Sequence, residues 1–235
     1  MATGASSALG RALLRRLWAE PAWAGVRFFV GGREAAVLDG VCSEARAAGV
    51  RAEPWIADLD LGPCSLPAGL PPLRGFVFAA GATEDAALAA LSLDRWERAW
   101  RINAGSHAAL LRGLALPGRL APGARGLLIG SLSGSRGNAG QAAYAAAKGS
   151  LEDLLALAPG GLRLNVLLPP LMPSPMLDGL GPAARASLFA ARLMDDPEPA
   201  AGCAEAAAFL LSDGASYVHR QVLHADTRVS ALGWD

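Results

Sequence analysis

The sequence is poor in cysteine, carries no net charge and contains no long apolar run. Three cysteines in 235 residues, without the spacing of metal ligands, are too few for a disulfide framework and suit a reducing compartment. The 21 basic and 21 acidic side chains cancel, which argues against a nucleic-acid or membrane partner bound through charge. No stretch of about 18 uncharged apolar residues predicts a membrane span, and the first residues lack a signal-peptide pattern. We therefore expect a cytoplasmic protein.

The apolar content of the chain is sufficient for one large core. Hydrophobic residues make up 52% of the sequence and the mean hydropathy is +0.30, which excludes a disordered chain. The length suits one α/β domain and is short for two. No internal repeat is visible, and the bias toward alanine, glycine and arginine is spread along the chain. We predict a single domain over residues 1–235.

Short apolar runs alternate with helical patterns along the sequence. Strands are predicted at residues 26–30, 51–57, 75–80, 126–130, 162–168 and 221–225. Helices are predicted at residues 11–23, 35–48, 91–116 and 200–211, and on the alanine-rich stretch that ends near residue 157. This alternation is typical of a Rossmann-type, doubly wound parallel sheet with helices on both faces.

The two ends of this pattern are irregular. Only residues 1–3 precede the first turn, whereas a full strand needs about five residues. Either the first strand is truncated or the natural start lies upstream of Met1. Residues 171–199 are rich in proline, methionine and alanine, and we predict a lid or substrate segment there.

Small residues near the start predict a phosphate-binding turn. Thr3, Gly4 and Gly10 bracket a turn into a helix, where free N–H groups and the positive end of the helix dipole favour a pyrophosphate. Ala8 stands where such loops often have a third glycine, and its methyl group narrows the approach. This pattern is weak on its own, because small residues before a helix are common.

Polar or small residues end the next predicted strands as well. At the tip of the second strand an acid selects a free ribose 2′-hydroxyl, whereas an arginine accommodates a 2′-phosphate. Arg33 at this tip therefore favours NADP(H) over NAD(H), although a solvated loop arginine would look the same. Asp58 can accept a hydrogen bond from an adenine amino group, unless it is an ordinary loop acid. Gly81 leaves room for a cofactor along the backbone. Since the carboxyl ends of parallel strands share one edge, these residues and Ser131 predict one dinucleotide site.

The stretch from Ile129 to Lys148 carries the candidate chemistry. Tyr144 and Lys148 are four residues apart, so on a helix they lie on the same face. An adjacent ammonium is expected to lower the pKa of the Tyr144 phenol, which could then donate a proton at neutral pH. Ser131 could hydrogen-bond the same oxygen. The alternative is an alanine helix with one surface tyrosine and one solvated lysine.

These motifs resemble the short-chain dehydrogenase/reductase family, and within it the 3-oxoacyl-[acyl-carrier-protein] reductases. The family's cofactor motif TGxxxGxG is similar to TGASSALG, and its NNAG motif is similar to FAAG. Asn103 in RINAG matches a catalytic asparagine that the family carries on a helix. The spacing of Ser, Tyr and Lys in SLSGSRGNAGQAAYAAAK is that of the family, and LRLNVLLPP resembles the strand and turn that follow.

The resemblance implies NADPH-dependent reduction of a keto group, on a 3-oxoacyl thioester or a related fatty-acyl or polyketide substrate that is small or carrier-bound. Tyr144 would donate the proton, while Lys148 would lower its pKa and hold the nicotinamide ribose. Ser131 would orient the carbonyl, and Asn103 would hold a water for proton resupply. The implied cofactor-binding residues are Gly4, Ser6, Ser7, Leu9, Gly10, Arg33, Asp58, Ala80, Gly81, Tyr144, Lys148, Pro169 and Ser174.

Departures from the family pattern support a second hypothesis. Ala8 and Pro170 stand where the family has glycines, and the helix behind Lys148 reaches its following strand several residues early. In the family this helix usually forms part of a dimer interface. The chain could therefore be a catalytically weak or inactive subunit that binds cofactor or a reductase partner. A homo- or hetero-oligomer is expected under either hypothesis.

Overall fold

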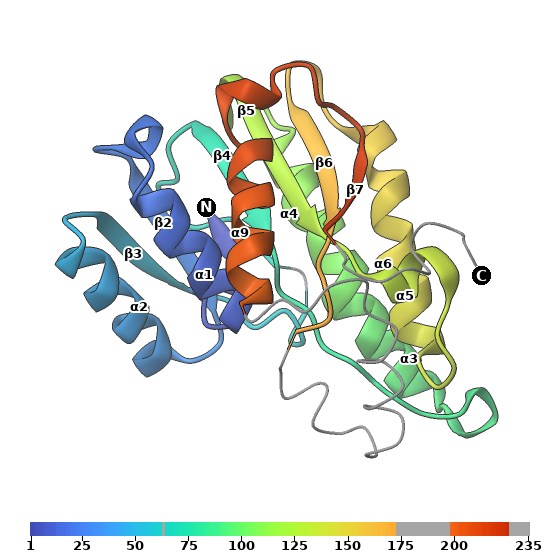
Figure 1. Cartoon of the computed structure of the whole chain (residues 1–235). Helices are drawn as coiled ribbons and strands as arrows, with labels where there is room; N and C mark the ends of the chain where they lie inside the picture. The colour runs from blue at the N-terminus through green and yellow to red at the C-terminus, as the bar shows by residue number, and fades with distance from the viewer. Residues whose placement is uncertain (63, 173–197, 226–235) are drawn as a thin grey trace.

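One parallel sheet of seven strands, in the order β3-β2-β1-β4-β5-β6-β7, forms the framework (Figure 1). The computed structural model describes residues 1–62, 64–172 and 198–225. The strands are β1 (Ala2–Thr3), β2 (Arg27–Gly32), β3 (Arg51–Ile56), β4 (Leu73–Phe78), β5 (Leu120–Ile129), β6 (Arg163–Leu168) and β7 (Val222–His224). The predicted Rossmann-type sheet is confirmed, and its strand order reverses at β1.

Helices cover both faces of the sheet (Figure 1). They are α1 (Ala8–Trp18), α2 (Ala35–Ala47), α3 (Leu93–Trp100), α4 (Ser106–Leu114), α5 (Leu132–Arg136), α6 (Ala142–Asp153) and α9 (Pro199–Leu210). One apolar core joins α1, α2 and α9 to the sheet around Leu13, Leu38 and Ala207. A second core joins α4 and α6 to the opposite face around Leu110 and Leu151. Both faces of the sheet are therefore buried beneath helices, as is usual for a parallel sheet.

The central strand β1 is very short, as predicted. Ala2 pairs with Val30 of β2 and Val77 of β4, and Thr3 pairs with Gly31 and Phe78. The chain then turns at Gly4 into α1. This places the start of α1 at the carboxyl edge of the sheet, at the point where the strand order reverses.

Two segments differ from the prediction. The glycine-rich stretch after Ser131, where no helix was predicted, contains the short helix α5. The hydroxyl of Ser131 caps this helix by accepting the backbone N–H of Ser133 at 3.2 Å. The helix predicted over residues 91–116 is divided by a π-helical turn, Arg101–Gly105, between α3 and α4. Such turns occur frequently at functional sites, and this one carries Asn103.

The remaining boundaries shift by small amounts. β5 begins at Leu120, earlier than expected, where Leu120 pairs with Leu73 at the start of β4. α1 ends at Trp18, before Pro21. Most of the predicted lid, including Ser174, lies outside the described residues. Within the described ranges, no helix has both the length and the apolar character needed to cross a membrane.

Candidate functional site

A cleft of about 580 Å³ lies beyond the carboxyl ends of β1 to β4. Among the residues that line it are the predicted cofactor residues Gly4, Ser6, Ser7, Arg33, Asp58, Ala80 and Gly81. They come from the turns that follow four different strands. The structure therefore brings together, in one cleft, residues that the sequence placed only at separate strand ends.

Glycine makes the turn at the start of α1 possible. Gly4 has φ +68°, and a Cβ there would lie 2.8 Å from the backbone of Ala79 and Ala80. A Cβ on Gly10 would lie 2.2 Å from the Gly4 carbonyl oxygen. Ser7 fixes the same turn, because its hydroxyl donates to the Gly4 oxygen at 2.8 Å and accepts the Gly10 N–H at 3.0 Å. The amino end of α1 is thus held against the cleft with its backbone accessible.

Other predicted cofactor residues lie away from this cleft. Leu9 is buried in the core below α1. Gly10 packs behind the turn, where its N–H binds Ser7. Pro169 follows β6 and is half-buried. In the described part of the chain, none of these three residues lines the cleft, and neither do Tyr144 and Lys148.

Thr3, predicted only to begin the phosphate-binding turn, also lines the cleft. Its hydroxyl oxygen accepts the backbone N–H groups of Ala79 at 3.2 Å and Ala80 at 3.3 Å. It is 3% exposed, so these bonds are shielded from water. A buried threonine at the end of an apolar strand was the available signal. Thr3 holds the start of the loop after β4 against the Gly4 turn.

The four predicted catalytic residues lie at the carboxyl ends of β4 and β5. Asn103 and Lys148 approach each other at Gly81, where a Cβ would lie 2.8 Å from Asn103 Oδ1 and 3.3 Å from Lys148 Nζ. Tyr144 is hydrogen-bonded with the Ser131 side chain. Tyr144 and Lys148 project from α6 and are 7% and 4% exposed. The structure therefore rejects the alternative of a surface tyrosine beside a solvated lysine.

Burial determines the direction of both pKa shifts. It lowers the pKa of Lys148 to about 8, because the ammonium is removed from water. It also raises the pKa of Tyr144; the hydrogen bond with Ser131 opposes this rise, and the charge of Asp85 adds to it. The expectation that Lys148 lowers the pKa of Tyr144 is wrong in this structure. The Lys148 ammonium instead donates to the carbonyl of Ile129 at 2.8 Å.

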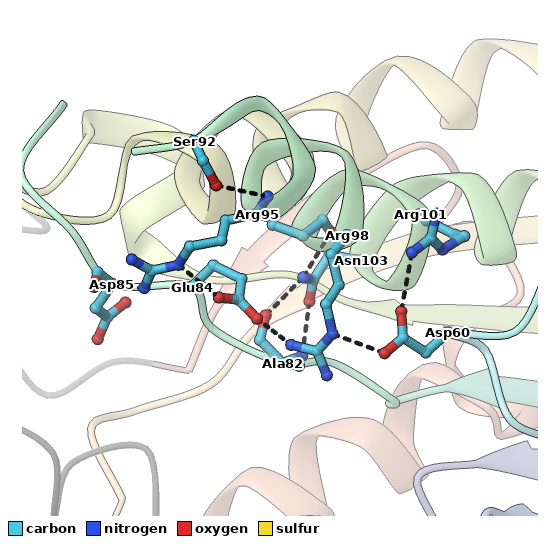
Figure 2. Close-up of polar contacts among 10 residues, drawn as sticks. Asp60, Ala82, Glu84, Asp85, Ser92, Arg95, Arg98, Arg101 and Asn103 are labelled. Atoms are coloured by element: carbon cyan, nitrogen blue, oxygen red, sulfur yellow. Dashed lines mark hydrogen bonds and ion pairs between the residues drawn. The ribbon is translucent and has the colours of Figure 1, made fainter. Parts of the chain in front are cut away.

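Asn103 is fully buried, and its amide is bonded to backbone groups (Figure 2). Its Nδ2 donates to the carbonyls of Ala82 at 2.7 Å and Ala99 at 2.9 Å. Its Oδ1 accepts the N–H of Ala82 at 3.2 Å. The side chain therefore fixes the loop after β4 at Ala82, next to Gly81 and Lys148.

Gln141 joins the two loops beside Tyr144. Its Nε2 donates to Asp85 Oδ1 at 3.2 Å, and its Oε1 accepts the Ser133 hydroxyl at 2.9 Å. The backbone N–H of Ala86 donates to the Gly140 carbonyl at 2.8 Å in the same region. These bonds connect the loop after β4 with the segment that carries Ser131. Gln141 was not predicted as a site residue, because its only signal in the sequence was its place just before an alanine-rich helix.

The helices α5 and α6 touch through glycine. A Cβ on Gly134 would lie 2.7 Å from the backbone nitrogen of Gly149, and a Cβ on Gly149 would lie 2.9 Å from the Gly134 oxygen. Any larger residue would push the two helices apart. Because Ser131 caps α5 and Tyr144 lies on α6, this contact helps to set the distance between their hydroxyl groups.

Comparison with known proteins adds an independent line of evidence. A family model described as enoyl-(acyl carrier protein) reductase matches residues 68–228. The 3-oxoacyl-[acyl-carrier-protein] reductase FabG of Salmonella typhimurium is 34% identical over 152 residues, which cover 63% of this chain and 62% of that protein. FabG of Escherichia coli is 32% identical over 152 residues, which again cover 63% of this chain and 62% of that protein. The matched region thus spans less than two thirds of these relatives.

Two further similarities extend over more of the chain. The inactive 2-(S)-hydroxypropyl-CoM dehydrogenase 2 of Xanthobacter autotrophicus is 31% identical over 215 residues, or 83% of this chain and 93% of that protein. The crystal structure of a blue fluorescent protein from a metagenomic library, in complex with NADPH, superposes with a TM-score of 0.81. It is 26% identical, and the match covers 97% of this chain and 96% of that one. Fold, motifs and relatives agree that the chain belongs to the short-chain dehydrogenase/reductase family.

Proposed function

We propose that the protein is an NADPH-dependent ketoreductase. Its substrate is a 3-oxoacyl thioester or a related fatty-acyl or polyketide ketone, either small or bound to a carrier protein. The observation that carries this proposal is the buried phenol of Tyr144, hydrogen-bonded with Ser131, at the same sheet edge as a cleft lined by Gly4 and Arg33. The FabG relatives are named as reductases of this substrate class, and the similar blue fluorescent protein is described in complex with NADPH.

The cleft fits a dinucleotide. The close backbone approach at Gly4 and the amino end of α1 suit a pyrophosphate, which Ser6 and Ser7 would help to hold. The exposed Arg33 suits a 2′-phosphate, and Asp58 suits an adenine amino group. Lys148 and Tyr144 would bind the nicotinamide ribose. When bound, NADPH supplies the hydride that reduces the carbonyl carbon.

The side chains of the site then have distinct tasks. The Ser131 hydroxyl orients the carbonyl oxygen, and the Tyr144 hydroxyl donates a proton to it as it becomes a hydroxyl group. The raised pKa of Tyr144 keeps the phenol protonated at neutral pH, as a proton donor requires. The Lys148 ammonium lies beside Gly81, where it would meet the nicotinamide ribose. Asn103 fixes the loop at Ala82 that borders this group.

A Tyr144→Phe variant tests the chemistry. The purified chain is mixed with NADPH and a generic 3-oxoacyl thioester, and the loss of NADPH absorbance is followed. We expect the variant to lose about 100-fold or more in kcat, because it lacks the proton donor. It should still bind NADPH, weakened by no more than the loss of one hydrogen bond to the nicotinamide ribose, which fluorescence titration measures. Unchanged turnover in the variant would contradict the mechanism.

The second hypothesis, an inactive subunit, has one specific observation in its favour. One relative, which matches 83% of this chain, is named as inactive. An inactive subunit predicts NADPH binding without turnover by the purified chain, and turnover only when a reductase partner is added. The same assay with and without that partner separates the two hypotheses, and size-exclusion chromatography reports the proposed homo- or hetero-oligomer.

Cofactor preference is tested at Arg33. An Arg33→Asp variant loses the cation that suits a 2′-phosphate and gains an acid that suits a free 2′-hydroxyl. We expect the ratio of kcat/KM for NADPH over NADH to fall about tenfold or more, the range for a lost charge-assisted contact. Arg46→Asp, which changes the same charge on the exposed surface of α2, should leave the ratio unchanged. Equal ratios in both variants would refute the role of Arg33.

A further inference from the structure

Three arginines of one helical segment bind two carboxylates beside the cleft (Figure 2). The arginines are Arg95, Arg98 and Arg101, and the carboxylates are those of Asp60 and Glu84. Arg98 Nε lies 2.6 Å from Asp60 Oδ2, and Arg98 Nη1 bonds Glu84 Oε1. Arg95 binds Glu84 at 3.0 Å, and Arg101 binds Asp60 at 3.1 Å. Arg98 therefore binds carboxylates from two loops that are far apart in the sequence.

The two carboxylates belong to different parts of the cleft. Asp60 follows β3 and lines the cleft itself, and Glu84 follows Thr83, which lines it after β4. The side chains of Glu84, Asp60 and Arg98 are 14%, 25% and 34% exposed, so their interactions are partly shielded from water. The hydrogen bond from Arg98 is the main reason that the pKa of Asp60 is lowered, which agrees with a strong pair. The planar guanidinium suits this task, because its N–H groups can bind two carboxylates at once.

Arg98 holds the loop after β3 through Asp60, together with Arg101, which binds the same carboxylate. The backbone N–H of Asp60 donates to Asp58 Oδ1 at 3.0 Å, so the two acids form one local unit. Asp58 is the residue predicted to accept the adenine amino group. A shift of Asp60 would therefore move the predicted adenine contact.

The loop after β4 is anchored to the catalytic side of the molecule. Asn103 binds both backbone groups of Ala82, and Gln141 binds Asp85. Arg95 also donates to the Asp85 carbonyl at 3.0 Å. Arg98 thus connects the Asp58–Asp60 unit to a loop that is already fixed beside Lys148 and Tyr144.

We propose that Arg98 is a positioning residue for the dinucleotide: by binding Asp60 and Glu84 together, it holds the adenine side and the nicotinamide side of the cleft at a fixed separation. The inference rests on the proposed NADPH site. A site that is ordered before the ligand arrives loses less conformational entropy on binding, so its affinity is higher. Arg98 does not need to touch the ligand for this effect.

The test compares Arg98→Met with Arg16→Met. Arg16 is a matched control because it is 31% exposed and also joins two carboxylates, Glu20 and Glu205, at 2.7 Å each. Two properties are measured in the full chain: the Kd for NADPH by fluorescence titration, and hydrogen exchange of residues 57–62 without added nucleotide. We expect Arg98→Met to weaken NADPH binding about tenfold and to speed exchange in this segment. Arg16→Met should change neither property.

Each outcome has a defined meaning. If the unaltered chain binds no NADPH, the proposed function fails and the inference fails with it. If it binds and Arg98→Met binds equally well, or exchange in residues 57–62 is unchanged, only the inference is overturned. Arg98→Lys provides a second variant in case Arg98→Met does not fold. One ammonium replaces the guanidinium fork there, so we expect an intermediate Kd, and a Kd equal to that of the unaltered chain would also overturn the inference.

Discussion

The pKa of Tyr144 depends on one acidic residue, Asp85, that has no task in the proposed reaction. The charge of Asp85 raises the pKa of Tyr144, in addition to the effect of burial, while Ser131 lowers it. Asp85 is exposed and is held by Gln141. A carboxylate at this position favours the protonated phenol, which is the form that keto reduction consumes.

An Asp85→Asn variant should therefore shift the pH profile of reduction. Asparagine keeps an oxygen that can accept the Gln141 bond but removes the charge, so the pKa of Tyr144 falls. Reduction requires the protonated phenol, and its rate declines as the pH rises through this pKa. We expect the decline of kcat to begin at lower pH in Asp85→Asn. Asp39→Asn, an equal charge change on α2, should leave the profile in place; a shared shift would point to net charge instead.

At the scale of residues, the sequence predicted the site where the signal is local. Gly4, Arg33, Asp58 and Gly81 follow strands directly, and the parallel sheet brings them into one cleft. The pKa of Tyr144 could not be predicted from its spacing to Lys148, because burial is a property of the packed molecule.

The ion pairs of Arg98 could not be predicted from the sequence, because they too depend on the packed fold. Its partners are 38 and 14 residues away in the sequence, in loops whose positions only the fold defines. On the sequence alone, an arginine on a charged helix looks like a solvated side chain.

At the scale of elements, the contact between α1 and the Gly4 turn is the most restrictive. A Cβ on Gly10 would lie 2.2 Å from the Gly4 oxygen, whereas a Cβ on Gly40, in α2, meets no atom within 4 Å. Both glycines lie in helices, so alanine improves helix propensity at each. The difference between the two positions therefore isolates the steric effect of the turn.

Gly10→Ala and Gly40→Ala should change stability in opposite directions. We expect Gly10→Ala to lower the free energy of unfolding by about 1–3 kcal/mol, the usual effect of overpacking. Gly40→Ala should raise it by about 0.5–1 kcal/mol. Urea unfolding monitored by circular dichroism measures both values. Equal effects would show that the turn can move to accept a methyl group.

Two elements near the proposed catalytic residues were not predictable from local patterns. α5 is short and rich in glycine and serine, so its propensity is low, and the cap at Ser131 is visible only in the structure. The π-helical turn at Arg101–Gly105 changes the backbone hydrogen-bond pattern between α3 and α4. Both were hidden because sequence patterns report which face is buried and not how the backbone is bonded.

At the scale of the whole molecule, the buried ammonium of Lys148 links stability to pH. Its pKa is lowered from 10.5 to about 8 in the folded chain. Below pH 8 the ammonium is charged in both states, and its burial destabilises the folded one. Between about pH 8 and 10.5 the folded chain has lost this proton and the unfolded chain still binds it. The contribution of Lys148 to the free energy of unfolding therefore rises with pH across this window.

A Lys148→Met variant should lack this rise. At about 1.4 kcal/mol per pKa unit, the full effect in the unaltered chain is roughly 3 kcal/mol. Urea unfolding at pH 7.5 and pH 10 measures the change in the free energy of unfolding of each protein. The effects of other titratable groups are shared, so they largely cancel when the two changes are subtracted. Parallel changes with pH in the two proteins would mean that the ammonium is not buried as described.

The fold itself was predictable because the strongest patterns repeat. Apolar runs that end in glycine or polar residues alternate with amphipathic helices, and only a parallel sheet covered on both faces accommodates them. The order of the strands did not follow from any one run. It was not predicted, because the neighbour of each strand depends on contacts between residues that are distant in the sequence.

The glycine contact between α5 and α6 has a consequence for divergence within this family. A single nucleotide change converts a glycine codon to one for alanine or serine. At Gly134 or Gly149 such a change would separate the two helices, and with them Ser131 and Tyr144, while every catalytic side chain stayed encoded in the gene. A lineage could thus lose turnover and keep its signature motif unaltered. The site therefore depends on these two facing glycines as well as on its polar side chains, and this chain has glycine at both positions.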